Sequence, residues 1–151
     1  MSENTTHLLS VKDLHTSFTT DHGEVQAVNG VSFNLDAGKV LGIVGESGSG
    51  KSVTAYSIMQ ILADNGRITS GEILYKGEDI SRWDESKMQD FRGKCCSIIF
   101  QDPMTSLNPV FTIERQISEA FLIHQDISKK EAAKQSVEML RAVKIPNPEN
   151  V

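Results

Sequence analysis

The chain has 151 residues, of which 38% are hydrophobic, 23% charged and 6% aromatic. This length suits one ordinary domain, and the near-average composition excludes wholesale disorder, collagen-like repeats and disulfide scaffolds. Fifteen Lys and Arg against twenty Asp and Glu give a net charge of −5, so no global positive field would attract nucleic acid and we expect no nucleic-acid partner.

The first part of the chain is expected to be extended. Residues 8–18 place β-branched and aromatic side chains near period two, Gly23 marks a turn, and residues 25–38 continue the pattern, which predicts an antiparallel pair. The next run, KVLGIV at residues 39–44, is short and mostly apolar. Such a run is typical of a strand buried on both faces.

A glycine-rich loop follows. Residues 45–52 read GESGSGKS and match the pattern G-x-x-x-x-G-K-[ST] at every fixed position. Glycines let successive backbone N–H groups converge on phosphate oxygens, and the Lys51 ammonium is suited to bridge the β- and γ-phosphates. The Ser52 hydroxyl would contact Mg²⁺. We expect the nucleotide to be held by Gly45, Ser47, Gly48, Ser49, Gly50, Lys51 and Ser52, with no side-chain role for Glu46 or Ser49.

Helices and short strands are expected after the loop. The pattern predicts a helix over 53–62, a hairpin around 72–77, a polar helix or loop over 83–93 and a buried strand over 96–100. Thr112 and Ser128 are typical N-cap residues and predict two closing helices, over 113–124 and 129–143. The apolar face expected for the last helix comprises Ala133, Val137, Leu140 and Val143.

The two cysteines and the length of the apolar runs indicate the cellular compartment in which we expect the protein. Cys95 and Cys96 are adjacent and cannot cross-link distant segments, so we expect reduced thiols in a cytoplasmic protein. No apolar run approaches the roughly 18 to 20 residues that a membrane span needs. If the protein works at a membrane, another chain is expected to anchor it.

A second segment narrows the class of P-loop protein. Residues 92–113, RGKCCSIIFQDPMTSLNPVFTI, resemble the stretch around the Q-loop of ABC transporter ATPases, and IFQDPMTSLNP is similar to the oligopeptide and dipeptide importer branch. The resemblance implies that Gln101 is the Q-loop glutamine, which reaches the Mg²⁺ and γ-phosphate site. It also implies that Phe18, at the end of the first strand, stacks on the adenine.

The resemblance implies an α/β fold of the P-loop NTPase class, ABC ATPase type. Residues 8–44 would form an N-terminal antiparallel β subdomain and the P-loop strand, residues 45–101 would run from the P-loop helix to the Q-loop, and residues 102–151 would begin the helical subdomain. In this family the P-loop strand is flanked by strands that come later in the chain. The segment 39–44 would then lack its parallel partners, which predicts marginal stability and aggregation.

The function implied is ATP and Mg²⁺ binding in the energy-coupling subunit of a peptide importer, on the cytoplasmic face of the membrane. Its partners would be integral membrane permease subunits and a second ATP-binding subunit, with the cargo open between oligopeptides, dipeptides, nickel and others. The alternatives are a non-functional gene fragment, or a soluble P-loop kinase or GTPase. A kinase needs an arginine-bearing lid and a GTPase an N/T-K-x-D motif, and we find neither in the sequence.

Several motifs of a complete ABC ATPase are not found in this sequence. They are an LSGGQ-like signature, a Walker B Asp with the catalytic Glu after it, and a switch histidine; His124 falls inside a predicted helix, where a surface or packing role is expected. We therefore expect the first part of a nucleotide-binding domain, from a truncated gene or a partial gene model. Such a chain would bind nucleotide without hydrolysing it, because no base is positioned to activate water.

Overall fold

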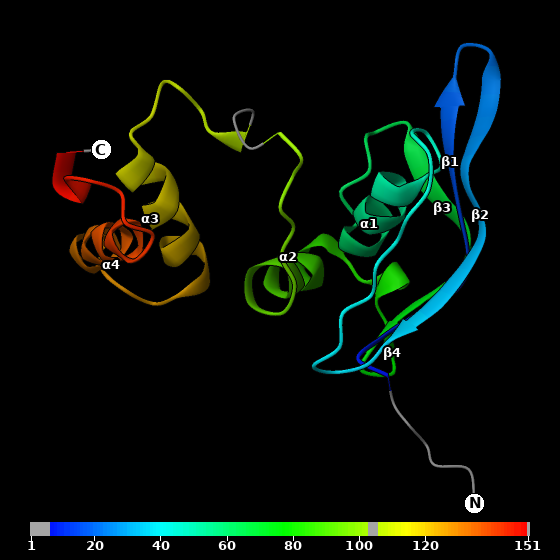
Figure 1. The fold of residues 1–151 in the computed structure, drawn as a ribbon, viewed down its shortest axis with the longest axis horizontal. Helices are drawn as coiled ribbons and strands as arrows, with labels where there is room; N and C mark the ends of the chain where they lie inside the picture. The colour runs from blue at the N-terminus through cyan, green and yellow to red at the C-terminus, as the bar shows by residue number, and fades with distance from the viewer. Residues whose placement is uncertain (1–6, 103–105, 151) are drawn as a thin grey trace, which may run out of the picture. The chain divides into compact units, whose positions relative to one another are not determined.

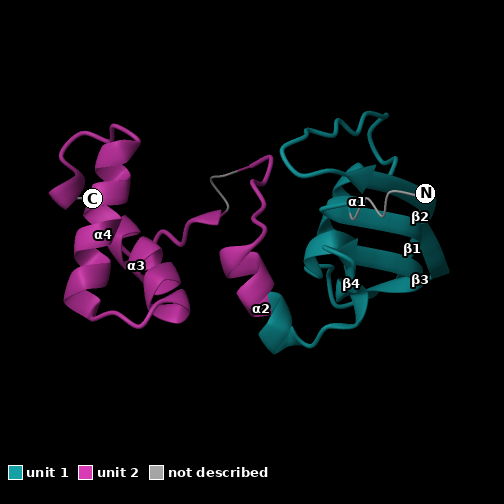
Figure 2. Cartoon of the chain, turned by 90° about the horizontal axis from the view of Figure 1, so that it is seen from below, with its two compact units in different colours: residues 1–88 teal, residues 89–151 magenta. Residues whose placement is uncertain are grey.

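The computed structural model describes residues 7–102 and 106–150. The chain divides into two compact units, Met1–Met88 and Gln89–Val151 (Figure 2). Helix α2 (Glu85–Lys94) crosses the boundary between them. Each unit is described by itself.

Unit 1 contains an antiparallel sheet (Figure 1). Its strands are β1 (Leu9–Thr20), β2 (Gly23–Leu35), β3 (Gly66–Tyr75) and β4 (Glu78–Asp79), in the spatial order β2-β1-β3-β4. The predicted pairing of the first two strands is confirmed, and so is the hairpin at Lys76 and Gly77. Strand β1 lies inside the sheet, because it pairs along its length with β2 on one side and with β3 on the other.

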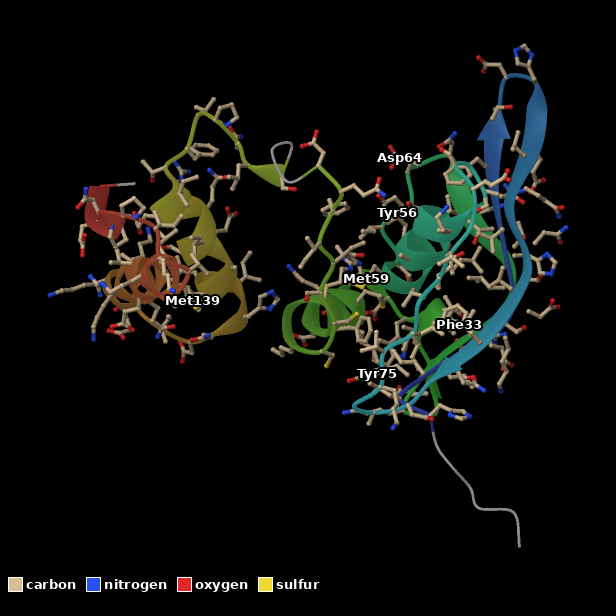
Figure 3. All side chains as sticks on the ribbon, viewed as in Figure 1. Phe33, Tyr56, Met59, Asp64, Tyr75 and Met139 are labelled. Carbon is tan, nitrogen blue, oxygen red and sulfur yellow. The ribbon has the colours of Figure 1, made fainter. Side chains whose placement is uncertain are left out.

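One face of the sheet is covered by helix α1 (Lys51–Met59), with the short helix η1 (Ile80–Arg82) after β4 (Figure 1). Met59, labelled in Figure 3, is the large buried side chain of α1. The helix was expected to continue to residue 62, but Gln60 has a left-handed backbone (φ 49°) and ends it. The buried apolar side chains of the unit are Val11, Leu14, Val28, Met59, Ile73, Ile80 and Met88.

The two segments expected to be buried strands are not strands. Residues 39–44 and 96–100 have no secondary structure, and Val40, Val44 and Ile99 are 98%, 93% and 94% exposed. A strand needs a neighbouring backbone to satisfy its N–H and C=O groups, and no strand of the described residues pairs with either segment. The apolar side chains of Val40, Val44 and Ile99 therefore lie almost fully in solvent.

Unit 2 contains most of α2, followed by α3 (Ile113–His124), α4 (Lys129–Ala142) and the short helix η3 (Pro148–Asn150). Both predicted caps are confirmed, because the Arg115 N–H donates to the Thr112 hydroxyl (3.3 Å) and the Glu131 N–H donates to the Ser128 hydroxyl (3.2 Å). Among the described residues, no helix combines the length and apolar character needed to cross a membrane.

The face that α4 buries differs from the expected one. Ala132, Ser136 and Leu140 are buried, whereas Val143 is 68% exposed. The Ser136 hydroxyl lies 2.9 Å from the Ser118 hydroxyl of α3, so the two helices meet through a polar contact that a hydrophobic pattern does not reveal. Leu140 is buried as predicted, whereas Ala132 and Ser136 each lie one position before the predicted Ala133 and Val137.

Candidate nucleotide-binding loop

The glycine-rich loop leads directly into α1. Gly48 and Gly50 have positive φ angles of 81° and 85°, which glycine adopts at little cost. Gly50 is the N-cap residue of α1, and no side chain caps the first N–H groups of the helix. Those N–H groups carry the positive end of the helix dipole and are suited to bind an anion.

Glycine is also required at position 50 because there is no room for a side chain. A Cβ atom at this position would lie 2.3 Å from the Ala27 carbonyl oxygen of β2, which real side chains do not tolerate. The Thr54 N–H (2.8 Å) and hydroxyl (3.0 Å) both donate to the Gly50 carbonyl and fix the first turn. The loop is therefore seated against the sheet at one defined point, where its backbone passes β2.

The Lys51 ammonium lies within the loop. It donates to the carbonyl oxygens of Gly45 (2.9 Å) and Glu46 (2.6 Å) and to the Ser49 hydroxyl (3.3 Å). The Ser49 N–H in turn donates to the Glu46 carbonyl (3.3 Å). One cation thus gathers three oxygen acceptors from a single turn of backbone.

The Ser49 side chain has a contact that the sequence did not indicate. Besides accepting from Lys51, its Oγ would lie 2.7 Å from a Cβ placed on Gly45, so it covers that glycine closely. The motif treats position 49 as variable, and the only available signal was a small hydroxyl residue two places before the lysine. Ser47 and Ser52 are exposed, which leaves the Ser52 hydroxyl accessible to a cation.

Phe18 belongs to the same unit as the loop. It lies near the end of β1 opposite Val25 of β2 and Gly66 of β3, and it is half-buried. Its ring rests on Gly66, since a Cβ there would lie 2.6 Å from the Phe18 Cε1 atom. Asn65 fastens the strand end, accepting from the Thr19 N–H (2.8 Å) and donating from its amide to the Thr19 carbonyl (3.0 Å).

Gln101 lies in unit 2, where it is exposed in a bend after the unpaired segment 96–100. Residues 103–105 of the segment that resembles the Q-loop region lie outside the described residues. The structure brings Gly45, Ser49 and Lys51 together and holds Phe18 in the same unit. The expectation that Gln101 reaches the same site stays a prediction.

The comparison with known families decides the class. The model of the ABC transporter family matches residues 28–150. The chain belongs to the ABC transporter family. This match covers the glycine loop, α1, the segment around Gln101, and helices α3 and α4. The soluble kinase and GTPase alternatives are therefore not supported.

Peptide-transport ATP-binding proteins are among the relatives of this ABC family chain. It is 53% identical over 145 residues to the oligopeptide transport ATP-binding protein OppD of Bacillus subtilis, covering 95% of this chain and 40% of that protein. Identity is 51% over 142 residues to the dipeptide transport protein DppD of the same organism, and 50% over 139 residues to OppD of Escherichia coli. The chain spans about 40% of the length of these relatives.

Solved ABC cassettes share the fold. The structure described as a dimeric post-hydrolysis state of the ATP-binding cassette MJ0796 has a TM-score of 0.76 at 20% identity, over 92% of this chain and 58% of that one. CbiO1 of Clostridium perfringens has a TM-score of 0.66 at 24% identity. The predicted fold class, a P-loop ATPase with an antiparallel β part and helices, is confirmed.

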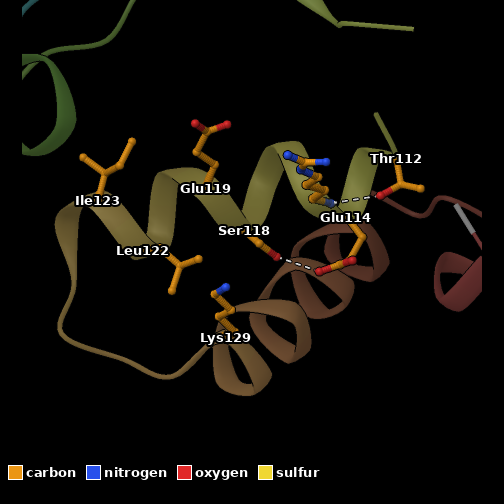
Figure 4. A pocket seen from close by; sticks show the side chains of 8 residues that line it. Thr112, Glu114, Ser118, Glu119, Leu122, Ile123 and Lys129 are labelled. Atoms are coloured by element: carbon orange, nitrogen blue, oxygen red, sulfur yellow. Dashed lines mark hydrogen bonds between the residues drawn. The ribbon is translucent and has the colours of Figure 1, made fainter. Parts of the chain in front are cut away.

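A groove of about 600 Å³ lies on unit 2 (Figure 4). Its lining residues all come later in the sequence than the glycine loop. Its lining includes Arg115, Glu119 and Leu122 of α3 and Lys129 of α4. The Ser118 hydroxyl donates to the Glu114 carboxylate (2.8 Å) beside it. The lining therefore combines charged and apolar side chains.

Proposed function

We propose that this chain binds Mg²⁺-ATP at residues 45–52, as part of the energy-coupling subunit of an oligopeptide or dipeptide importer. The observation that carries the proposal is the Lys51 ammonium held inside a turn of left-handed glycines at the uncapped start of α1. Positive charge and the uncapped N–H groups at the start of α1 lie close together there, and among the described residues no ion pair joins the Lys51 ammonium to an acidic side chain. Similarity to oligopeptide and dipeptide transport ATP-binding proteins supports the proposed cargo class.

The loop would exchange its internal contacts for phosphate contacts. Lys51 donates to the Gly45 and Glu46 carbonyl oxygens at 2.9 and 2.6 Å, and a phosphate oxygen carries more negative charge than either carbonyl. The ammonium would therefore turn toward the phosphate while the N–H groups at the start of α1 donate to its oxygens. Binding needs only a side-chain rotation, because the backbone turn is already formed.

The exposed Ser52 hydroxyl fits a magnesium ligand, since Mg²⁺ prefers oxygen donors and is commonly shared between a protein side chain and the phosphates of its nucleotide. Mg²⁺ supplies charge neutralisation of the β- and γ-phosphates when bound. We assign Gln101 as a second polar contact to this site. Phe18 would stack on the adenine, and such stacking contributes about 1 to 3 kcal/mol.

For the assembled importer we propose ATP hydrolysis coupled to transport, with permease subunits and a second ATP-binding subunit as partners at the cytoplasmic face of the membrane. Of that activity, we propose for residues 45–52 the binding of Mg²⁺-ATP. The segment that begins at Gln101 is our proposed permease contact. Leu122 and Ile123 are exposed on α3 and would provide apolar surface for contact with a permease subunit.

Calorimetric titration with Mg²⁺-ATP tests the proposal. The wild-type chain should bind, and Lys51→Ala should lose at least about tenfold in affinity because a charge-assisted contact is removed. Lys12→Ala is the matched control, since Lys12 is an exposed lysine of β1 whose ammonium contacts Glu72 instead (3.4 Å). Equal loss in both variants, or no wild-type binding, would overturn the proposal.

A further inference from the structure

Two hydroxyl groups meet in the core of unit 1. Thr16 of β1 and Ser57 of α1 are both 0% exposed, and their side-chain oxygens lie 2.8 Å apart. The Ser57 hydroxyl also lies 2.8 Å from the Val53 carbonyl, its acceptor within the helix. A buried hydroxyl is costly unless it is hydrogen-bonded, and an apolar residue of the same size would fill the space without that cost. The hydrogen bond between Thr16 and Ser57 therefore fixes where α1 lies on β1, and it adds no apolar burial.

The rest of the helix surface does little to fix that position. Apart from Ser57, the side chains that α1 buries are Thr54 and Met59. Apolar packing of one large side chain is non-directional and does not by itself set the position of the helix along the strand. A directional hydrogen bond opposes sliding, because its energy falls steeply with distance and angle. The second fixed point is Gly50, whose backbone lies against the Ala27 carbonyl.

The two partners sit on the elements that carry the two ends of the proposed nucleotide site. Thr16 is two residues before Phe18 in β1, and Ser57 is six residues after Lys51 in α1. The ring of Phe18 is itself held against Gly66. A shift of α1 along β1 would thus change the separation between this ring and the glycine loop.

We propose that Thr16 and Ser57 are positioning residues that set the spacing between the base-stacking ring of Phe18 and the phosphate-binding loop. This inference rests on the proposed function, because it assumes that one nucleotide spans Phe18 and Lys51. It deepens that function by assigning base recognition to a buried contact that touches no part of the nucleotide. The loop's own grip on phosphate is independent of the pair.

The test compares two ligands on the full chain, Mg²⁺-ATP and magnesium tripolyphosphate, which lacks the base and sugar. Thr16→Val keeps the side-chain shape and removes the hydroxyl. We expect it to weaken ATP binding about fivefold to tenfold, a part of the stacking contribution, and to leave tripolyphosphate binding within twofold. Thr16→Ser keeps the hydroxyl and should retain ATP affinity.

Two further variants make the result decisive. In a Phe18→Ala background, Thr16→Val should cause no further loss of ATP affinity, because there is no ring left to position. Ser10→Ala removes another nearly buried hydroxyl of β1, which donates to Asn34 (2.6 Å) rather than to α1, and should leave both affinities unchanged. If Thr16→Val does not fold, Ser57→Ala takes its place in the same comparison.

Equal weakening of both ligands, or additive losses with Phe18→Ala, would overturn the inference. So would equal affinity of the wild type for ATP and tripolyphosphate, which would show that the base contributes nothing. Those outcomes leave the proposed function standing, provided that the wild type binds Mg²⁺-ATP through Lys51. If the wild type binds neither ligand, the proposed function fails and this inference fails with it.

Discussion

The Lys51 ammonium donates at 2.6 Å to the carbonyl oxygen of Glu46, five positions earlier in the chain. The same ammonium reaches Gly45, so the side chain closes the loop on itself. A lysine in this position exchanges a neutral acceptor for a charged one when phosphate arrives, and that difference favours binding.

Substitution of Gly50 is expected to damage both stability and the loop. Gly50→Ala places a Cβ 2.3 Å from the Ala27 carbonyl at a φ of 85°. A left-handed non-glycine residue costs about 1 to 3 kcal/mol, and the clash adds to this, so we expect a loss of at least about 2 kcal/mol in urea unfolding. Gly42→Ala is the control, because nothing lies within 4 Å of its Cβ position. Equal stability of the two variants would contradict the structure.

Removal of the Ser17 hydroxyl is expected to be neutral or stabilising. Ser17 is 2% exposed, and its Oγ has no hydrogen-bond partner among the described residues. An unpaired buried hydroxyl is destabilising by about 1 to 3 kcal/mol. Ser17→Ala should therefore raise the midpoint of urea unfolding or leave it unchanged, whereas a loss above about 1 kcal/mol would reveal a partner for the hydroxyl.

The exposed segment 39–44 is expected to tolerate polar substitution. Val40 is 98% exposed, so Val40→Lys should change the free energy of unfolding by less than about 0.5 kcal/mol. Ile73→Ala, at a position with 0% exposure, should cost about 2 to 5 kcal/mol. Light scattering should show less self-association for Val40→Lys, because one exposed apolar side chain is gone. A large loss of stability from Val40→Lys would mean that this segment is packed in solution.

Asp79 is expected to make unit 1 acid-sensitive. Burial alone would raise the pKa of its carboxyl, but hydrogen bonds from the Ser81 hydroxyl and N–H and the charge of Arg82 outweigh this, so the pKa is lowered. The stabilisation is therefore complete above the ordinary pKa of about 4 and is lost as the pH falls through the lowered value. Unfolding measured between pH 6 and pH 2 should show a weaker pH dependence for Asp79→Asn; an unchanged slope would contradict this.

The sequence predicted the parts of the fold that depend on local patterns. The alternation in residues 8–18 and 25–38 indicated the β1–β2 hairpin, and Thr112 and Ser128 marked the helix starts that the structure has. The prediction of buried strands at residues 39–44 and 96–100 was wrong, because an apolar run forms a buried strand only if a partner backbone is present. Their sequence is suited to a core that the described residues do not supply.

The glycine loop was found from spacing, but its internal contacts were not. A motif gives the identity of Lys51 and not where its ammonium points, and no pattern indicated that Ser49 would accept from it at 3.3 Å. The Thr16–Ser57 contact joins residues 41 positions apart, which a local pattern cannot connect. Long-range polar contacts of this kind depend on how the helix lies on the sheet.

The most direct test of the phosphate-loop assignment is a titration with Mg²⁺-ATP followed by backbone amide chemical shifts. We predict saturable shifts for the amides of Gly48, Gly50 and Lys51, and none for Gly23, the first residue of β2 after the β1–β2 turn. The shifts should vanish in Lys51→Ala at the same nucleotide concentration. Unmoved loop amides in the wild type, or the same shifts in both proteins, would contradict the account.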